Sequence, residues 1–103
     1  MTPIEERVIN AIKEDELIPF LQEMIRIPSM SANEHQVAEY IATRLRDWGF
    51  QEVFIQGIEG YPGRANLIAY LRGAKRKPTL MTTAHMDTVP IDTTDRDNWI
   101  GDP

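Results

Sequence analysis

The chain has 103 residues, of which 42% are hydrophobic and 26% charged, a composition typical of folded globular proteins rather than disordered chains. Its 11 lysines and arginines against 16 aspartates and glutamates give a net charge of −5, which disfavours nucleic-acid binding because phosphate contacts need a basic surface. The absence of cysteine excludes a disulfide scaffold, a thiolate metal site and a cysteine nucleophile.

No targeting or membrane segment is expected. The first residues are charged and lack the apolar core of a secretory signal, and the apolar runs are far shorter than the roughly 20 residues that span a bilayer. Together with the lack of cysteine, these features predict a soluble cytoplasmic protein with no membrane or nucleic-acid partner.

The first quarter of the chain predicts two helices. Thr2 and Glu5 form a capping box around a proline, so a helix is expected to begin there. Apolar residues at helical spacing predict a second helix from about Glu16 to Arg26, with Pro19 in its first turn. Pro28 is expected to end this helix, because the residue before a proline avoids helical geometry.

A third helix is expected after a second capping box, formed by Ser31 and Glu34. Gly49 suits the left-handed position that follows the end of such a helix. The apolar face of this helix is expected to pack on a sheet, with its last residue buried there, and consists of Val37, Tyr40, Ile41, Leu45 and Trp48.

Three strands are expected in the second half. Residues 53–55 and 66–71 are rich in strand formers, and the glycines and proline of 57–63 between them predict the turn of an antiparallel hairpin. Residues 79–84 predict a third strand, expected to be buried on both faces because it lacks polar alternation. The predicted fold class is therefore α/β.

Residues 88–103 show no regular period and are expected to be a loop that docks on something absent.

His85 and Asp87 are the residues best suited to chemistry. Residues two apart in extended backbone face the same side, so the carboxylate can hold one imidazole nitrogen and leave the other for a metal. Spacing alone leaves this reading open, because a histidine beside a turn aspartate is also a common structural pattern. His35 is expected to be an exposed helix residue. The acidic residues of the tail do not fit an EF-hand and are expected to be solvated: Asp92, Asp95, Asp97 and Asp102.

The sequence around His85 resembles a known motif. Residues 79–90 read TLMTTAHMDTVP, and Trp99-x-x-Asp-Pro103 follows. This pattern resembles the first metal-site motif of the zinc-dependent amidohydrolases and exopeptidases, with Ala84 in place of the usual glycine. That family includes acetylornithine deacetylase, succinyl-diaminopimelate desuccinylase, aminoacylase, carnosine dipeptidase and glutamate carboxypeptidase.

Upstream features resemble the same family, so the similarity covers nearly the whole chain. They are the segment LIPFLQEMIRIPS at 17–29, the helix end Trp48-Gly-Phe and the strand start Arg64-x-Asn66. The resemblance implies the N-terminal part of a three-layer, zinc-exopeptidase-like fold, with three helices followed by three strands of a mixed sheet. Residues 1–103 would be the N-terminal portion of the catalytic, metal-binding domain, and the rest of that domain and a dimerisation domain would be absent.

The resemblance also implies a role for each matching residue. His85 would be a direct ligand of one zinc ion in a two-zinc centre, and Asp87 would be the catalytic aspartate that holds His85. The remaining matching residues would shape or pack the loop near the site: Thr88, Val89, Pro90, Trp99, Asp102 and Pro103.

The implied reaction is hydrolysis of an amide or peptide bond, by a dipeptidase, a carboxypeptidase or an N-acyl amino acid deacylase. The cofactor would be two zinc ions, which cobalt could replace, and the substrate a peptide or N-acyl amino acid. The full-length relative would be a homodimer, and this chain alone would be inactive because the other ligands and the general base would lie outside it. Two alternatives stay open: a non-catalytic remnant that acts as a binding or interaction module, and a stand-alone structural domain whose His-x-Asp is coincidental.

Overall fold

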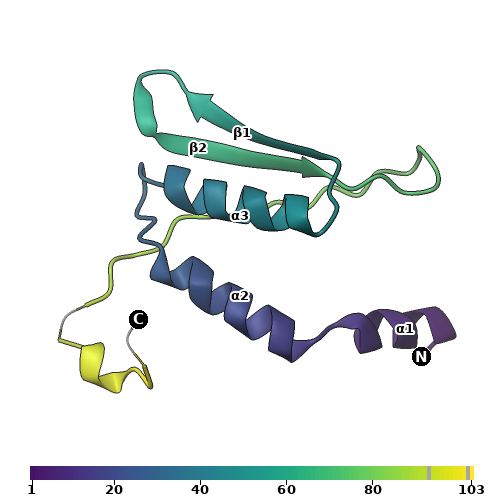
Figure 1. Ribbon diagram of the computed structural model, residues 1–103, viewed down its shortest axis with the longest axis horizontal. Coiled ribbons are helices and arrows are strands. Elements are labelled where there is room, and N and C mark those ends of the chain that lie inside the picture. The colour runs from purple at the N-terminus through teal and green to yellow at the C-terminus, as the bar shows by residue number, and fades with distance from the viewer. Residues whose placement is uncertain (93, 102) are drawn as a thin grey trace.

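The computed structural model describes residues 1–92, 94–101 and 103, which form three α-helices, a two-stranded sheet and a short 3-10 helix. In Figure 1 the hairpin, the third helix and the second helix lie in successive layers, and the first helix extends away from them. No helix in this part of the chain is long and apolar enough to cross a membrane. The elements are α1 (Pro3–Ala11), α2 (Glu14–Arg26), α3 (His35–Asp47), β1 (Glu52–Ile58), β2 (Tyr61–Tyr70) and η1 (Arg96–Asn98).

The start of α1 confirms the predicted capping box. The Thr2 hydroxyl accepts a hydrogen bond from the Glu5 backbone N–H at 3.3 Å, and the Glu5 carboxylate accepts one from the Thr2 N–H at 2.7 Å. Within the described residues α1 packs against no other helix or strand. Its stability therefore depends on local interactions such as this box.

The second helix is confirmed, but α2 begins at Glu14, and Pro19 lies inside it rather than in its first turn. Three acidic residues occupy the first turn, where they interact favourably with the helix dipole and support the earlier start. The helix ends as predicted: Ile27 is extended, with φ −84° and ψ 113°, directly before Pro28.

The capping box predicted for the third helix is wrong. The N-cap of α3 is Glu34, which has no side-chain cap bond, and the helix begins at His35. Ser31 instead donates its hydroxyl to the Asp87 carboxylate, and Glu34 turns back to accept the backbone N–H of Ala32. The Ser31 hydroxyl therefore bonds to a charged carboxylate 56 residues away, rather than to a backbone N–H of the helix as the local pattern predicts.

The end of α3 confirms the role predicted for Gly49, whose φ is +91°. The Gly49 N–H bonds to the Arg46 carbonyl and the Phe50 N–H to the Leu45 carbonyl, each at 3.0 Å. These two bonds form a Schellman motif, which satisfies carbonyls that the helix leaves unpaired.

Trp48 is not buried on the sheet as predicted; it is 49% exposed. Its ring lies edge-on to Phe20 of α2, with centroids 4.9 Å apart, and the Arg44 guanidinium sits 5.2 Å from its centroid. As the C-cap residue, Trp48 lies beyond the last turn of α3 and reaches α2 instead of the hairpin.

The hairpin is confirmed as antiparallel, with Phe54 opposite Ile68. Its turn is tighter than predicted, because Pro62 and Gly63 belong to β2 and only Glu59 and Gly60 lie between the strands. Gly60 has φ +80°, which a glycine adopts without a steric penalty.

The third strand, predicted over residues 79–84, does not form, and the sheet of the described residues is a two-stranded antiparallel one rather than a mixed one. The segment is unpaired and exposed, with Leu80 88% and Met81 85% accessible. A strand requires a neighbour that supplies hydrogen bonds, and β1 and β2 pair only with each other. Its apolar sequence is therefore left in solvent.

The core lies between α3 and the hairpin. Its buried apolar side chains are small and come mostly from one face of α3: Val37, Ala38, Ala42 and Ala65. Small residues at these positions let α3 approach the strands closely. The loop between α2 and α3 leads directly into this packed pair of layers (Figure 1).

Candidate functional site

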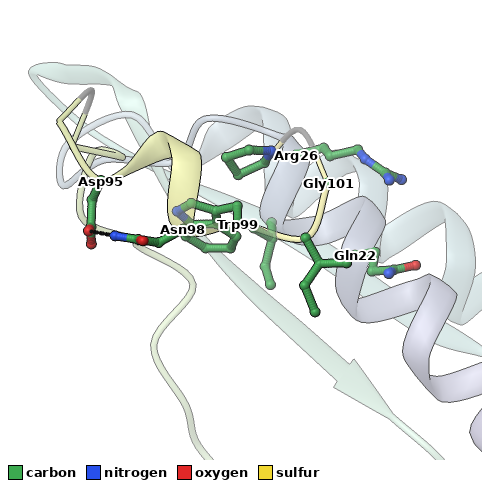
Figure 2. Close-up of a pocket in the computed structure, with 9 residues that line it drawn as sticks. Gln22, Arg26, Asp95, Asn98, Trp99 and Gly101 are labelled. Atoms are coloured by element: carbon green, nitrogen blue, oxygen red, sulfur yellow. Dashed lines mark hydrogen bonds between the residues drawn. The ribbon is translucent and has the colours of Figure 1, made fainter.

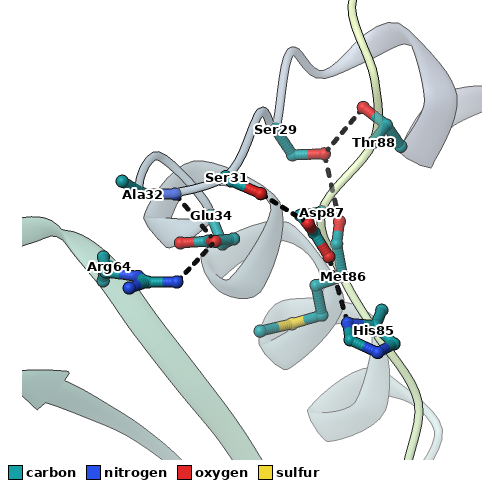
Figure 3. A network of polar contacts seen from close by, with 9 residues as sticks. All are labelled: Ser29, Ser31, Ala32, Glu34, Arg64, His85, Met86, Asp87 and Thr88. Atoms are coloured by element: carbon teal, nitrogen blue, oxygen red, sulfur yellow. Dashed lines mark hydrogen bonds and ion pairs between the residues drawn. The ribbon is translucent and has the colours of Figure 1, made fainter.

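Residues 85–88 are tied to the loop between α2 and α3 by Ser29, which is fully buried. The Ser29 hydroxyl donates to the Met86 carbonyl at 3.1 Å and lies 3.3 Å from the Thr88 hydroxyl. Figure 3 shows these two contacts of the Ser29 hydroxyl. In addition, the Thr88 N–H donates to the Ser29 carbonyl at 2.9 Å. The backbone is thus held on both sides of Asp87.

His85 and Asp87 face each other as the spacing predicts. Nδ1 of His85 lies 3.3 Å from Oδ1 of Asp87, and Oδ2 of the same carboxylate accepts the Ser31 hydroxyl at 2.7 Å (Figure 3). The His85 side chain is 95% exposed, whereas that of Asp87 is one-third exposed, at 33%. The imidazole is therefore accessible, and its second nitrogen is free to bind another group.

The pKa of Asp87 lies below its usual value, chiefly because the Ser31 hydroxyl donates to the carboxylate. Burial, the second-largest effect, raises this pKa in part, and the Asp87 backbone N–H and the nearby His85 ring each lower it by less. Asp87 is consequently charged at neutral pH and can hold a neutral imidazole by accepting its N–H.

A buried carboxylate shapes the loop that carries Ser31. Glu34 is 8% exposed, and its Oε1 accepts the Ala32 N–H at 2.9 Å and lies 4.0 Å from the Arg64 guanidinium. Oε2 of Glu34 has no hydrogen-bond partner among the described residues. Ala32 adopts φ +76°, which is rare for a non-glycine residue, so these contacts hold the loop in a conformation that it would not adopt alone.

Between this loop, the hairpin and the 84–87 segment lies a cavity of about 260 Å³. Two carboxylates, one guanidinium, one amide and one imidazole reach it, so it is suited to polar ligands. It is lined by Glu34, Ile58, Arg64, Ala65, Asn66, Ala84, His85, Met86 and Asp87.

The donor groups fit one position of a zinc centre but not a complete one. An exposed imidazole whose other nitrogen faces a carboxylate is the usual form of a zinc-binding histidine. A catalytic zinc needs three protein ligands, and within residues 1–92, 94–101 and 103 no three histidine or acidic side chains gather in that way. The described residues therefore present one such histidine, where a catalytic zinc would need three protein ligands.

The other histidine and the tail carboxylates agree with their predicted roles. The His35 side chain is 43% exposed on α3, with Nδ1 3.6 Å from Glu39. The described tail aspartates are exposed and bond locally: Asp92 accepts both the N–H and the hydroxyl of Thr94, and Asp95 accepts the Asn98 amide. Asp102, predicted to pack near the site, lies outside the described residues.

The other predicted loop residues lie at a second, apolar site. Thr88, Val89, Pro90 and Trp99 line a cavity of about 720 Å³ with Ile25, Arg26 and Met30, and none of these four lines the cavity at His85. Trp99 and Pro103 also line an adjoining space of about 540 Å³ against Gln22 and Arg26 of α2 (Figure 2). Of the predicted residues that the structure describes, it thus joins His85 and Asp87 in one polar site.

Sequence reasoning assigned Ser31 and Glu34 to helix capping and gave Ser29 no separate role. Their contacts join residues 56 to 59 positions apart or depend on a positive φ at Ala32. The sequence feature that could have indicated these residues is the short polar loop that begins at Pro28, after α2. Loops held between rigid elements often carry functional groups.

Comparison with known proteins gives the chain a set of fungal relatives. Over 75 residues, or 70% of this chain, it is 41% identical to a probable carboxypeptidase of Emericella nidulans, of which it covers 18%. Over 82% of the chain it is 36% identical to probable carboxypeptidases of Aspergillus flavus and Aspergillus oryzae, covering 20% of each. No family model and no solved structure matches the chain. The chain spans about a fifth of the length of these relatives, whose names support a peptidase family.

Proposed function

We propose that this chain is part of the catalytic domain of a zinc-dependent carboxypeptidase, in which His85 is a metal ligand and Asp87 orients it. The observation that carries the proposal is the accessible imidazole of His85 beside a carboxylate that Ser31 holds. The similarity to probable carboxypeptidases supports hydrolysis of peptide bonds as the reaction.

In this proposal Asp87, His85 and Ser29 each have a defined task. Asp87 accepts the Nδ1–H of His85 and so fixes the tautomer that presents Nε2. Ser29 holds the backbone around the pair, and the exposure of His85 leaves room for ligands from elsewhere in a longer protein. Zinc, when bound, polarises the scissile carbonyl and lowers the pKa of a bound water.

The remaining parts are proposed to come from outside residues 1–103, because the described residues provide one ligand where three are needed. We place this chain in the N-terminal portion of the catalytic domain, with a second zinc, the general base and a dimerisation domain supplied by the rest. A peptide with a free C-terminus is the substrate that the relatives' names favour over an N-acyl amino acid.

A chimera tests the proposal. Residues 1–103 replace the matching segment of the Emericella nidulans relative, and zinc content and release of C-terminal amino acids from N-blocked dipeptides are measured. His85→Ala should remove bound zinc and reduce turnover by more than the roughly 10–100-fold caused by loss of a supporting partner. His35→Ala is the matched control, because it removes the other histidine, and it should keep both properties.

Equal zinc content and turnover in the His85→Ala and His35→Ala chimeras would contradict the role of His85. A folded chimera that binds no zinc and has no turnover, beside an active parent relative, would favour a non-catalytic binding module. The absence of a three-ligand cluster in the described residues is the observation that keeps this second function in view.

A further inference from the structure

The two oxygens of the Asp87 carboxylate have different partners. Oδ1 lies 3.3 Å from His85 Nδ1, and Oδ2 accepts the Ser31 hydroxyl at 2.7 Å. The Asp87 side chain is only partly covered, and His85 is almost fully exposed, so packing alone does not fix either group. The direction of the carboxylate plane therefore depends on its hydrogen bonds, chiefly the one from Ser31, beside that from its own backbone N–H.

The backbone that carries Ser31 is itself held in place. Ser29, two residues earlier, is bonded to Met86 and Thr88 on either side of Asp87. On the other side of Ser31, the Asn33 N–H bonds to the Met30 carbonyl at 2.8 Å, and the Ala32 N–H bonds to buried Glu34. Ser31 thus projects from a fixed loop onto a segment that the same loop anchors.

We propose that Ser31 is a positioning residue, which orients the Asp87 carboxylate and through it selects the Nδ1–H tautomer of His85. Its importance for metal binding rests on the proposed function above, whereas its effect on the imidazole does not. Ser31 acts on His85 indirectly: its hydroxyl bonds to Asp87, and Asp87 in turn faces the imidazole.

The mechanism is a restriction of rotation. A carboxylate held at Oδ2 keeps Oδ1 turned toward Nδ1, so the ring proton is stabilised on that nitrogen and Nε2 keeps its lone pair. Without the hydroxyl, only its own backbone N–H and His85 still hold the Asp87 carboxylate, so it rotates more freely and the exposed ring exchanges between both tautomers. The hydroxyl, rather than the volume of the side chain, is the feature that matters.

The tautomer is measured on the chain itself without metal. Ring-nitrogen NMR with labelled histidine, at about pH 8 where an ordinary imidazole is neutral, observes only two rings, those of His35 and His85. We expect His85 to show separate resonances for a protonated Nδ1 and an unprotonated Nε2. Ser31→Ala should move these two resonances toward each other, and Ser31→Thr, which keeps the hydroxyl, should restore them.

Thr83→Val is the matched control, because it removes a hydroxyl from an exposed residue two positions before His85. It should leave the His85 resonances unchanged, and the His35 resonances should stay constant in every variant. Unchanged His85 resonances in Ser31→Ala, or averaged or Nε2-protonated resonances in the wild-type chain, would overturn the proposal.

A second measurement extends the test to metal binding in the chimera. Ser31→Ala should weaken zinc binding about 10-fold, at the lower end of the effect of supporting partners, with recovery in Ser31→Thr. If His85→Ala leaves zinc binding intact, the proposed function fails, while the tautomer result still decides the role of Ser31. If His85→Ala abolishes zinc binding but Ser31→Ala changes neither tautomer nor affinity, only the positioning role fails.

Discussion

The Asp87 carboxylate combines a contact with a neighbour in sequence, His85, and a contact with Ser31, which lies 56 residues away. Its lowered pKa comes chiefly from the Ser31 hydroxyl, and the effect of His85 is smaller than that of Ser31 and than the opposing effect of burial. In the proposed function, a carboxylate that is charged at neutral pH suits His85, because a histidine must be neutral to bind a metal.

Asp87→Asn should separate charge from shape at this position. The amide keeps an oxygen acceptor, but it removes the negative charge that faces His85. In the chimera we expect zinc affinity and turnover to fall by roughly 10–100-fold, with unchanged circular dichroism. Near-normal turnover at saturating zinc would show that Asp87 does not support His85.

At the scale of elements, β2 and the loop before α3 meet at a glycine. A Cβ at Gly63 would lie 2.4 Å from the Ala32 carbonyl oxygen and 2.8 Å from the Asn33 side-chain oxygen. The first of these atoms is backbone, so it cannot move without moving the loop that carries Ser31. Close approach of this strand to the loop therefore requires glycine.

Gly63→Ala should destabilise the chain by about 1–3 kcal/mol, the usual effect of overpacking, and should disturb the contact between Ser31 and Asp87. Gly57→Ala is the matched control in β1, because a Cβ there meets nothing within 4 Å, and it should change stability by no more than about 0.5 kcal/mol. Urea unfolding of both variants measures the difference. Equal stabilities would mean that the loop and β2 are not in close contact.

The first helix is an element without tertiary support in the described chain, and it has only 9 residues. A helix of this length is marginal in water, so its capping interactions decide whether it forms. Hydrogen bonds from the backbone and then the side chain of Thr2 hold the Glu5 pKa below its ordinary 4.5, against a small opposing effect of burial.

The lowered pKa of Glu5 predicts acid sensitivity of α1. The stabilisation is present above pH 4.5 and is lost as the pH falls through the lower pKa of the capped state. Backbone chemical shifts of residues 3–11 should therefore move toward coil values as the pH is lowered below 4.5. Glu5→Gln should show a much smaller change over the same range. An equal change in both chains would rule out Glu5 as the cause.

The local parts of the fold could be predicted from the sequence because their signals lie within a few residues. The Thr2 box, the Gly49 helix end and the hairpin all depend on short-range hydrogen bonds and backbone conformation. The pairing of His85 with Asp87 followed from spacing for the same reason. Ser31 could not be assigned correctly, because its partner lies 56 residues away.

The parts that depend on neighbours could not be predicted. Residues 79–84 have the composition of a buried strand, but no strand of the described chain pairs with them. Trp48 has the spacing of a core residue, but its place at the helix end directs it to α2. In both cases the sequence shows that the side chains are apolar, but their burial depends on which other elements pack against them.

At the scale of the whole molecule, large apolar side chains lie mainly outside the core. The buried apolar set consists of one valine and three alanines, while Leu80, Met81, Val89 and Ile100 are among the most exposed residues described. Within the described residues, both strands of the hairpin also have an unpaired edge, since the sheet there contains only two strands. Surfaces of this kind favour association with other protein surfaces or with further copies of the chain.

The isolated 103-residue chain should therefore self-associate, bind zinc weakly and show no peptidase turnover. Exposed apolar segments and free strand edges drive the association, and a single histidine ligand in the described residues cannot form the three-ligand centre that catalysis needs. Sedimentation should show a mass that rises with the concentration of the chain.

Zinc should raise the unfolding temperature little, because stabilisation by a ligand grows only with the logarithm of the zinc concentration over its dissociation constant. The assay uses zinc or cobalt with N-blocked dipeptides and N-acyl amino acids. Sub-micromolar zinc binding with metal-dependent turnover by a monomer would show that the chain contains a complete site, and that its catalytic ligands need no contribution from outside.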